Sequence, residues 1–296
     1  MKRALAVAVV LLGLLAGCGS GSSTTTAPEV ISSGDATSPG RGAPECSEEE
    51  VGSSDETPFT VVHYVDDGAL GAVCLGSGDP VLRDAWDALA TIASPAELAL
   101  LGLFGGFTDP ETGDSDESTY AFVTPPTTGD TFQMAVNLPA FEADPDEALL
   151  TIAHEFSHVF TAVPSELDRS DQAWATCTTY LAANGCFVPG SLIAEWVDRF
   201  WSPWIDEIDP DTEATVAAGE DRCAADPGFF GPYAASDPEE DFAESFSAFV
   251  FRVPANGPRQ QARLDLMAAR PELTEYRERA DAAGLTPRPN TFDRCG

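Results

Sequence analysis

Two histidines and a glutamate stand close together in the segment Thr151–Phe160, as His154-Glu155-x-x-His158. Residues four apart lie on the same face of a helix, so both imidazoles can bind one metal ion. Glu155 follows the first histidine directly, and its carboxylate can reach a water molecule on that ion. Two histidines and a carboxylate base at this spacing are typical of zinc sites that activate water for hydrolysis. The segment therefore predicts a catalytic zinc site, with His154 and His158 as ligands and Glu155 as general base.

The alternative for this segment is an ordinary buried helix with two incidental histidines. Against it, the chain has only three histidines, and two of them are here. Asp144-Pro145-x-Glu147 upstream is a helix start signal, with an N-cap residue, a proline at the first position and an acid at the third. Apolar residues recur at helical spacing on another face of the same helix: Leu149, Ile152, Phe156, Val159 and Val163. These features favour the metal site.

A catalytic zinc site needs a third protein ligand and an open position. The downstream run Asp237–Val250 is a candidate helix in which Glu240 and Glu244 lie one turn apart on one face. Geometry alone permits either as the ligand. Another face of this helix is lined by Phe242, Phe246 and Phe249. Because Glu240 is also the third residue after Asp237, a capping-box glutamate on an ordinary surface helix is the alternative interpretation.

The run Glu240-x-Phe-Ala-Glu244-x-Phe, after an HExxH motif, resembles the catalytic domain of anthrax lethal factor and related gluzincins. The resemblance implies that Glu240 binds the zinc and that Glu244 orients a ligand histidine. It also implies that Tyr233, seven residues before Glu240, stabilises the reacting oxyanion. It covers these two helices and Tyr233, well under half of the chain. The implied fold class is α+β, a gluzincin-like zincin domain with a small β-sheet, a mostly helical remainder and one Zn²⁺ per chain.

The first residues of the chain read as a targeting segment. Lys2 and Arg3 precede an apolar run, residues 4–16, that is too short to span a bilayer and is typical of a signal peptide. The run ends Leu-Ala-Gly-Cys at Cys18, which resembles the bacterial lipobox and implies cleavage before Cys18 and its lipidation. A plain secretory signal with an incidental cysteine is the alternative. We expect an exported, cell-surface lipoprotein of a bacterium.

After Cys18, residues 19–44 contain almost no large apolar residues and predict a flexible tether. Residues 45–296 are long enough for one large domain, which we expect to be the zinc metallopeptidase. Six cysteines lie in this part: Cys46, Cys74, Cys177, Cys186, Cys223 and Cys295. An even number in an exported protein predicts three disulfides, of unknown connectivity. The first pair we expect is Cys177–Cys186, closing the end of a short helix.

Periodicity and turn signals place the remaining elements. Strands are predicted at residues 59–65, 69–75, 119–123 and 132–138. Helices are predicted at residues 79–92, 94–104, 170–183, 191–208 with a break at Pro203, 258–269 and 271–283. The tryptophans of the fourth of these helices are expected in the core. In gluzincins the strand near the HExxH helix is often a sheet edge that pairs with extended substrate, so we expect that role for the strand at 132–138.

The charge of the chain limits its partners. The formal net charge is −34 at pH 7, and Lys2 is the only lysine. Such a surface repels nucleic acid and anionic lipid, so we expect no nucleic-acid partner and membrane contact only through the lipid. The ordinary role of this charge is solubility. A more specific role is to steer basic peptides toward the site.

Together these features predict a zinc-dependent endopeptidase held outside a bacterial membrane. Two other classes remain open. One is a surface lipoprotein that binds zinc or a partner without catalysis, although pure binding needs neither Glu155 nor Tyr233. The other is a solute-binding or adhesive lipoprotein without metal. Metal analysis of the purified protein separates the lipoprotein without metal from the endopeptidase and from the zinc-binding lipoprotein.

Overall fold

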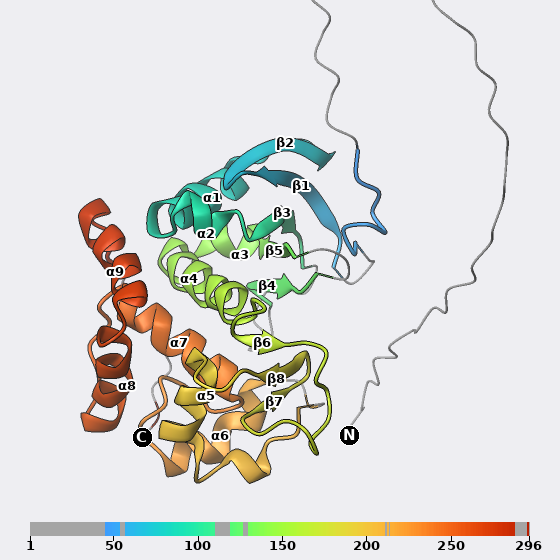
Figure 1. Cartoon of the computed structure of the whole chain (residues 1–296). Coiled ribbons are helices and arrows are strands. Elements are labelled where there is room, and N and C mark those ends of the chain that lie inside the picture. Colours follow the sequence, from blue (N-terminus) through green and yellow to red (C-terminus); the bar gives the residue numbers. More distant parts are fainter. Residues whose placement is uncertain are drawn as a thin grey trace, which may run out of the picture. The chain divides into compact units, whose positions relative to one another are not determined.

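Among the residues described, five strands form the larger sheet, in the order β2-β1-β3-β5-β4 (Figure 1). The computed structural model describes residues 45–53, 57–109, 119–126, 130–210, 212, 214–287 and 295. The strands of this sheet are β1 (Phe59–Asp66), β2 (Ala69–Gly76), β3 (Leu101–Phe107), β4 (Ala121–Thr124) and β5 (Phe132–Asn137). Neighbouring strands are antiparallel except β3 and β5, which are parallel. The mixed α+β class is therefore confirmed.

The strands predicted at residues 59–65 and 69–75 are confirmed and pair as the β1–β2 hairpin, whose turn explains why it forms. The turn residues Asp67 and Gly68 have φ angles of 49° and 77°. Two successive positive φ angles match the right-handed twist of the flanking strands, and Asp-Gly is one of the sequences that favour such a turn. At Gly68 a side chain would also collide with the carbonyl oxygen of Pro95. The hairpin is thus set by both local turn chemistry and packing.

The predicted helix at residues 94–104 is wrong beyond its first turn. Helix α2 (Pro95–Leu98) is short, and the chain then enters β3. A β-carbon at Gly105 would lie 2.8 Å from the ring of Phe59, and one at Gly106 would lie 2.8 Å from the side chain of Leu138. The two glycines are therefore sites of close packing inside a buried strand, not a helix terminus.

The helices carry the two segments singled out by their chemistry. In chain order the remaining helices are α1 (Pro80–Ile92), α3 (Leu138–Ala143), α4 (Pro145–Thr161), α5 (Leu192–Trp196), the π-helix η1 (Val197–Trp201), the 3-10 helix η2 (Ile205–Glu207), α6 (Val216–Ala225), α7 (Pro238–Val250), α8 (Pro258–Ala268) and α9 (Pro271–Ala283). Helix α4 lies between the large sheet and α7 (Figure 1). Both α4 and α7 start where the sequence predicts, because Asp144 and Asp237 accept hydrogen bonds from the first backbone N–H groups.

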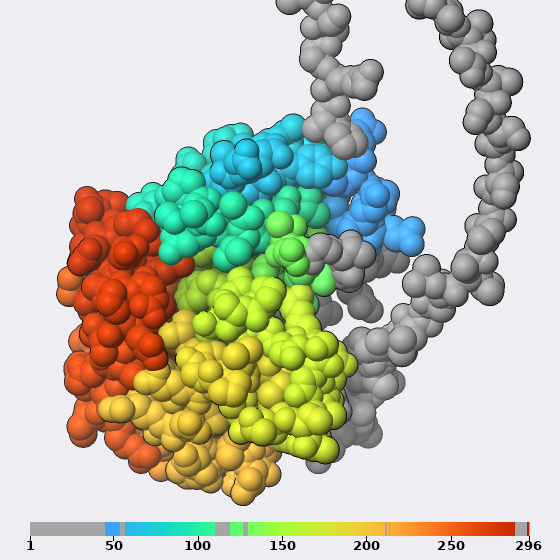
Figure 2. Space-filling view, viewed as in Figure 1, coloured from blue at the N-terminus to red at the C-terminus, as the bar shows by residue number. Residues whose placement is uncertain are grey.

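An aromatic core holds α4, α7 and α9 together. Phe160 of α4 packs edge-on against Phe246 of α7, with ring centroids 5.1 Å apart, and Phe246 packs against Tyr276 of α9 at 5.2 Å. The hydroxyl of Ser247 donates a hydrogen bond of 2.7 Å to the carbonyl oxygen of Leu150, which links α7 to α4 directly. Figure 2 shows the C-terminal helices α8 and α9 in red along one flank, where α9 contacts α1. This packing fixes the relative position of α4 and α7.

A buried carboxylate in the first turns of α7 fixes this helix to α5, η1 and α8. Asp241 is fully buried, and its Oδ2 accepts hydrogen bonds of 2.9 Å from the indole N–H groups of Trp196 and Trp201. Its Oδ1 lies 2.9 Å from Nε of Arg263 on α8. The expected core position of these two tryptophans is confirmed, and so is the break near Pro203, since η1 ends at Trp201.

The predicted helix at residues 170–183 is wrong. The chain instead makes turns there and contributes to a small second sheet of β6 (Leu167–Asp168), β8 (Gly185–Phe187) and β7 (Leu181–Ala182). Oδ1 of Asp168 accepts from the backbone N–H and hydroxyl of Ser170, and this local bonding competes with a helix. The Cys177–Cys186 disulfide then ties the segment to β8.

The six described cysteines pair as Cys46–Cys74, Cys177–Cys186 and Cys223–Cys295. The predicted three disulfides and the Cys177–Cys186 pair are confirmed, although that pair staples a hairpin and not a helix end. Disulfides are typical of an oxidising, extracellular environment. In the described part of the chain, no helix is both long and apolar enough to cross a membrane. The predicted signal peptide, Cys18 and the tether at 19–44 lie outside the described residues.

Candidate metal centre

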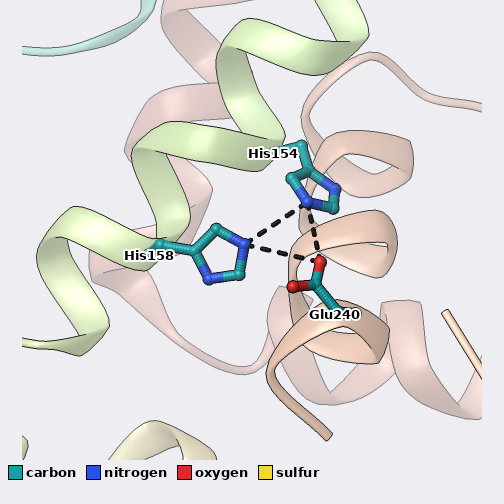
Figure 3. Close-up of side chains that lie close together, drawn as sticks. All are labelled: His154, His158 and Glu240. Atoms are coloured by element: carbon teal, nitrogen blue, oxygen red, sulfur yellow. Dashed lines mark hydrogen bonds and ion pairs between the residues drawn. The ribbon is translucent and has the colours of Figure 1, made fainter. Parts of the chain in front are cut away.

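Three predicted ligand residues converge at the interface of α4 and α7 (Figure 3). Nε2 of His154 lies 3.0 Å from Oε2 of Glu240, and Nε2 of His158 lies 3.5 Å from the same oxygen. The two Nε2 atoms are 3.3 Å apart. The structure therefore brings together two helices that are far apart in sequence, and their side chains point toward one another.

The spacing of these three atoms fits a metal ion. Ligands about 2.0–2.2 Å from a tetrahedral zinc ion lie roughly 3.3 Å from one another. Oε2 of Glu240 is buried and accepts no hydrogen bond of ordinary geometry from any described residue. Two imidazole nitrogens and a carboxylate oxygen that share one small space, with one of them unsatisfied, form a donor set suited to Zn²⁺. Glu240 does not complete a capping box, so the alternative interpretation of this residue is not supported.

The titration of these groups shows how strongly the pocket favours positive charge. Burial lowers the pKa of His154, but the close contacts with Glu240 and Glu244 and their negative charges outweigh it, so the pKa is raised well above its usual value. Burial raises the pKa of Glu240, but the charges of His158 and His154 close beside it outweigh the burial and lower the pKa. A proton or a metal cation can satisfy this pocket. A bound divalent ion would displace the proton, because metal ligands must be deprotonated.

The second nitrogen of His154 has its own partner. Nδ1 of His154 lies 3.2 Å from Oε1 of Glu244, one turn along α7 from Glu240. A carboxylate at this position accepts the Nδ1–H and leaves the lone pair of Nε2 free for a metal. Glu244 therefore lies where the resemblance places an orienting carboxylate, and it is Glu240 that faces both histidines.

The centre opens into a cleft of about 560 Å³, whose lining includes Glu155, His158, Tyr233 and Glu240. One wall is the edge strand β4, through Ala121, Phe122 and Val123. The expectation that the strand at 132–138 forms the sheet edge is wrong, because β5 lies between β3 and β4. The edge beside the candidate centre belongs to β4 instead.

Glu155 and Tyr233 share this cleft with the candidate ligands. Burial raises the pKa of the Glu155 carboxyl more than the charges of His154 and His158 lower it, which is typical of a general base. The ring of Tyr233 lies against His154, with centroids 5.9 Å apart. Burial and the negative charges of Glu240 and Glu155 raise the pKa of Tyr233, so its hydroxyl stays protonated and is available as a donor.

Three further cleft residues escaped prediction from the sequence: Tyr180, Asp237 and Glu239. The hydroxyl of Tyr180 donates a hydrogen bond of 2.9 Å to Oδ2 of Asp237. The acidic start of α7 was a signal for both carboxylates, but the sequence analysis considered Asp237 only as a helix cap and assigned no role to Glu239. Tyr180 lies in the segment wrongly predicted as helix, and nothing in its sequence context points to the cleft.

We compared the chain with protein-family models, curated proteins and solved structures, and none of the three comparisons found a match. The basis for a functional inference is therefore the geometry and donor chemistry of the centre itself.

Proposed function

We propose that the protein is a zinc-dependent endopeptidase of the gluzincin type, anchored outside a bacterial membrane through lipidated Cys18. The observation that carries the proposal is the convergence of His154, His158 and Glu240 on one point. Glu155 and Tyr233 line the same cleft. A ligand set, a carboxylate base and a hydroxyl donor in one cleft are the groups that peptide hydrolysis requires.

Each residue has a separate task. A bound Zn²⁺ supplies Lewis-acid polarisation and lowers the pKa of a bound water molecule toward neutrality. Glu155 accepts the proton of the attacking water and delivers it to the leaving amine. Tyr233 donates a hydrogen bond to the scissile carbonyl oxygen as negative charge develops there. Glu244 holds the ring of His154 in one tautomer and orientation.

The edge strand supports a peptide as the substrate. An extended peptide can add to β4 as a further strand, so that main-chain hydrogen bonds hold it along the cleft. Because β4 lines the same cleft as Glu155 and His158, a peptide in this position would pass the metal centre. Binding through the main chain places few demands on the ends of a substrate, which favours cleavage within a chain.

The test is metal content combined with hydrolysis. We expect the purified full chain, in detergent, to contain about one zinc per molecule and to cut an unstructured peptide library read by mass spectrometry. Chelation should abolish cleavage, added zinc should restore it, and Glu155→Gln should be inactive. A full zinc complement without any cleavage would reduce the protein to a zinc-binding lipoprotein, and a chain that takes up no metal would refute the proposal.

A further inference from the structure

A second cavity, of about 410 Å³, adjoins the metal cleft at the edge strand β4. Side chains from the N-terminal segment and from several strands of the large sheet line it, among them Val51, Phe59, Leu103, Phe122, Thr124 and Gln133. Phe122, Pro125 and Phe132 line both the cleft and the second cavity, so the two spaces meet there. The proposed chemistry makes no use of the second cavity.

The two spaces lie mainly on opposite faces of the large sheet. Successive side chains of a strand point to opposite faces. In β4, Ala121 and Val123 pack in the core that contains α4, whereas Phe122 packs with Phe59 and Phe107 on the other face. The second cavity lies on this other face, because Phe59 and Phe122 form part of its lining. A group bound there would therefore point away from the metal centre.

The lining of the second cavity suits an apolar group. The rings of Phe59 and Phe122 pack edge to face, with centroids 6.1 Å apart, and Leu103 lines the cavity beside them. The charged side chains among the described lining residues are those of Glu49 and Glu50, and both are exposed. An apolar side chain that entered would leave water and contact these rings, which is favourable in proportion to the area that it buries.

The N-terminal segment forms a fixed wall of the second cavity. Val51 is buried, and its carbonyl oxygen accepts a hydrogen bond of 3.0 Å from Nε2 of Gln133 on β5. The disulfide of Cys46 and Cys74 ties the same segment to β2. The cavity is therefore formed before any ligand binds, as binding sites for small groups usually are.

A peptide added to β4 as a further strand would reach both spaces. Residues directly opposite each other in paired strands have their side chains on the same face. A peptide residue opposite Phe122 would thus direct its side chain to the face of the second cavity, and its two neighbours would direct theirs to the face of the metal cleft. Pro125 has no N–H group to donate, so the ladder ends where the two spaces meet.

We propose that the second cavity binds a large apolar side chain of the peptide substrate, aromatic or branched aliphatic, and so sets a sequence preference at one position. This inference rests on the proposed peptidase function and adds its substrate class. The bound side chain takes no part in the chemistry. It is held equally in the substrate and in the transition state, so it lowers KM and leaves kcat little changed.

The first test varies one residue at a time in a peptide that is cleaved at a known bond. Glycine, leucine and phenylalanine are compared at each position near that bond. At one position we expect kcat/KM for phenylalanine or leucine to exceed that for glycine by about 10- to 100-fold, the range for burial of one apolar side chain. Most of this difference should lie in KM. An equal kcat/KM at every position would overturn the inference, and this measurement needs no variant.

The second test fills the cavity. Thr124 and Thr131 are exposed and line it, so Thr124→Trp, or Thr131→Trp if the first variant does not fold, should bring the ratio of phenylalanine to glycine close to one. The matched control is Thr60→Trp, at an exposed position of β1 that lines neither space, and it should keep the ratio. A ratio that persists in the filled variants would belong to the metal cleft, and a ratio lost in the control as well would not depend on the cavity. Either result would overturn the inference.

A binding measurement separates this inference from the proposed function. Zinc-loaded Glu155→Gln should bind a fluorescent peptide with phenylalanine at the preferred position more tightly than its glycine partner, and Glu155→Gln with Thr124→Trp should not. Such selective binding without hydrolysis by the unmodified protein would uphold the cavity and refute the peptidase. Hydrolysis with no apolar preference in rate or binding would uphold the peptidase and refute the cavity. Neither hydrolysis nor selective binding would refute both.

Discussion

Oε1 of Glu244 lies 3.2 Å from Nδ1 of His154, whereas Glu240 faces the other nitrogen of the same ring. The two glutamates, which helical spacing alone leaves equally able to bind the metal, therefore lie at different nitrogens of the same imidazole. Only Glu240 also lies near His158, with 3.5 Å between its Oε2 and Nε2 of that residue. The two carboxylates should therefore differ sharply in what their removal does to metal binding.

Glu240→Ala should purify nearly free of zinc and inactive, because it leaves only two protein ligands. Glu244→Ala should keep all three ligands, lose about 10- to 100-fold in zinc affinity and recover part of its activity in added zinc. Titration of both variants with zinc against a competing chelator ranks them. If Glu244→Ala is the variant that cannot be reloaded, the two roles are exchanged.

Glu155→Gln should separate metal binding from chemistry. The amide has the size of the carboxylate and does not alter the three candidate ligands, so zinc should stay near one per chain. Hydrolysis should fall to background, because the amide cannot accept the proton of water. Zinc content by mass spectrometry and peptide cleavage are measured on the same sample. A parallel loss of zinc and activity would show that Glu155 has been given the wrong role.

Tyr233→Phe removes only the hydroxyl that we place at the scissile carbonyl oxygen. Loss of one such donor typically lowers kcat by about 10²- to 10³-fold. Zinc affinity and KM should change little, since the ring and its contact with His154 remain. Steady-state kinetics on one defined peptide provide the measurement. Unchanged turnover would make Tyr233 a packing residue.

Arg263→Met tests the anchor behind α7. It removes the cation beside the buried carboxylate of Asp241, and breaking a buried pair in this way typically costs about 3–5 kcal/mol of unfolding free energy. The matched control is Arg252→Met, whose partner Asp281 is on the surface, with an expected cost below about 1 kcal/mol. Urea unfolding of both variants gives the comparison, and equal costs would mean that Asp241 does not depend on Arg263.

The disulfides predict the thiol content. Alkylation under denaturing, non-reducing conditions should find no free thiol, because six cysteines are paired and Cys18 is proposed to carry lipid. Two or more reactive thiols would overturn the pairing. Replacing Cys177 and Cys186 together by serine removes the cross-link of a short loop, and such a loss typically costs about 2–3 kcal/mol.

The sequence predicted the parts of the site that local rules control. The helices of His154 and Glu240 begin at Asp144 and Asp237, because an N-cap side chain followed by proline is a signal that needs no distant contact. The choice between Glu240 and Glu244 could not be made from spacing. It depends on how α7 is rotated against α4, which the aromatic core and the Asp241 anchor decide.

The elements that were wrong depend on distant contacts. Residues 101–107 form a short apolar run that fits a buried strand as well as a helix, and only pairing with β1 and β5 makes it a strand. The segment at 170–183 has helical periodicity, but the link of Cys177 to Cys186 and local side-chain bonds override it. Tyr180 was missed for the same reason, because its position in the cleft depends on the hairpin of β7 and β8 that directly follows it.

The Cys223–Cys295 bond closes a covalent ring of the chain that includes Tyr233, Glu240 and Glu244, whereas His154 and His158 lie outside the ring. A single backbone cut within the ring, for example in the turns between α6 and α7, would open the ring without releasing the part that carries Glu240 and Glu244. If the proposed peptidase cuts its own copies at such a place, the two parts of its candidate site would stay covalently joined. On a denaturing gel, such a cut would be seen only after the disulfides are reduced, as two bands in place of one.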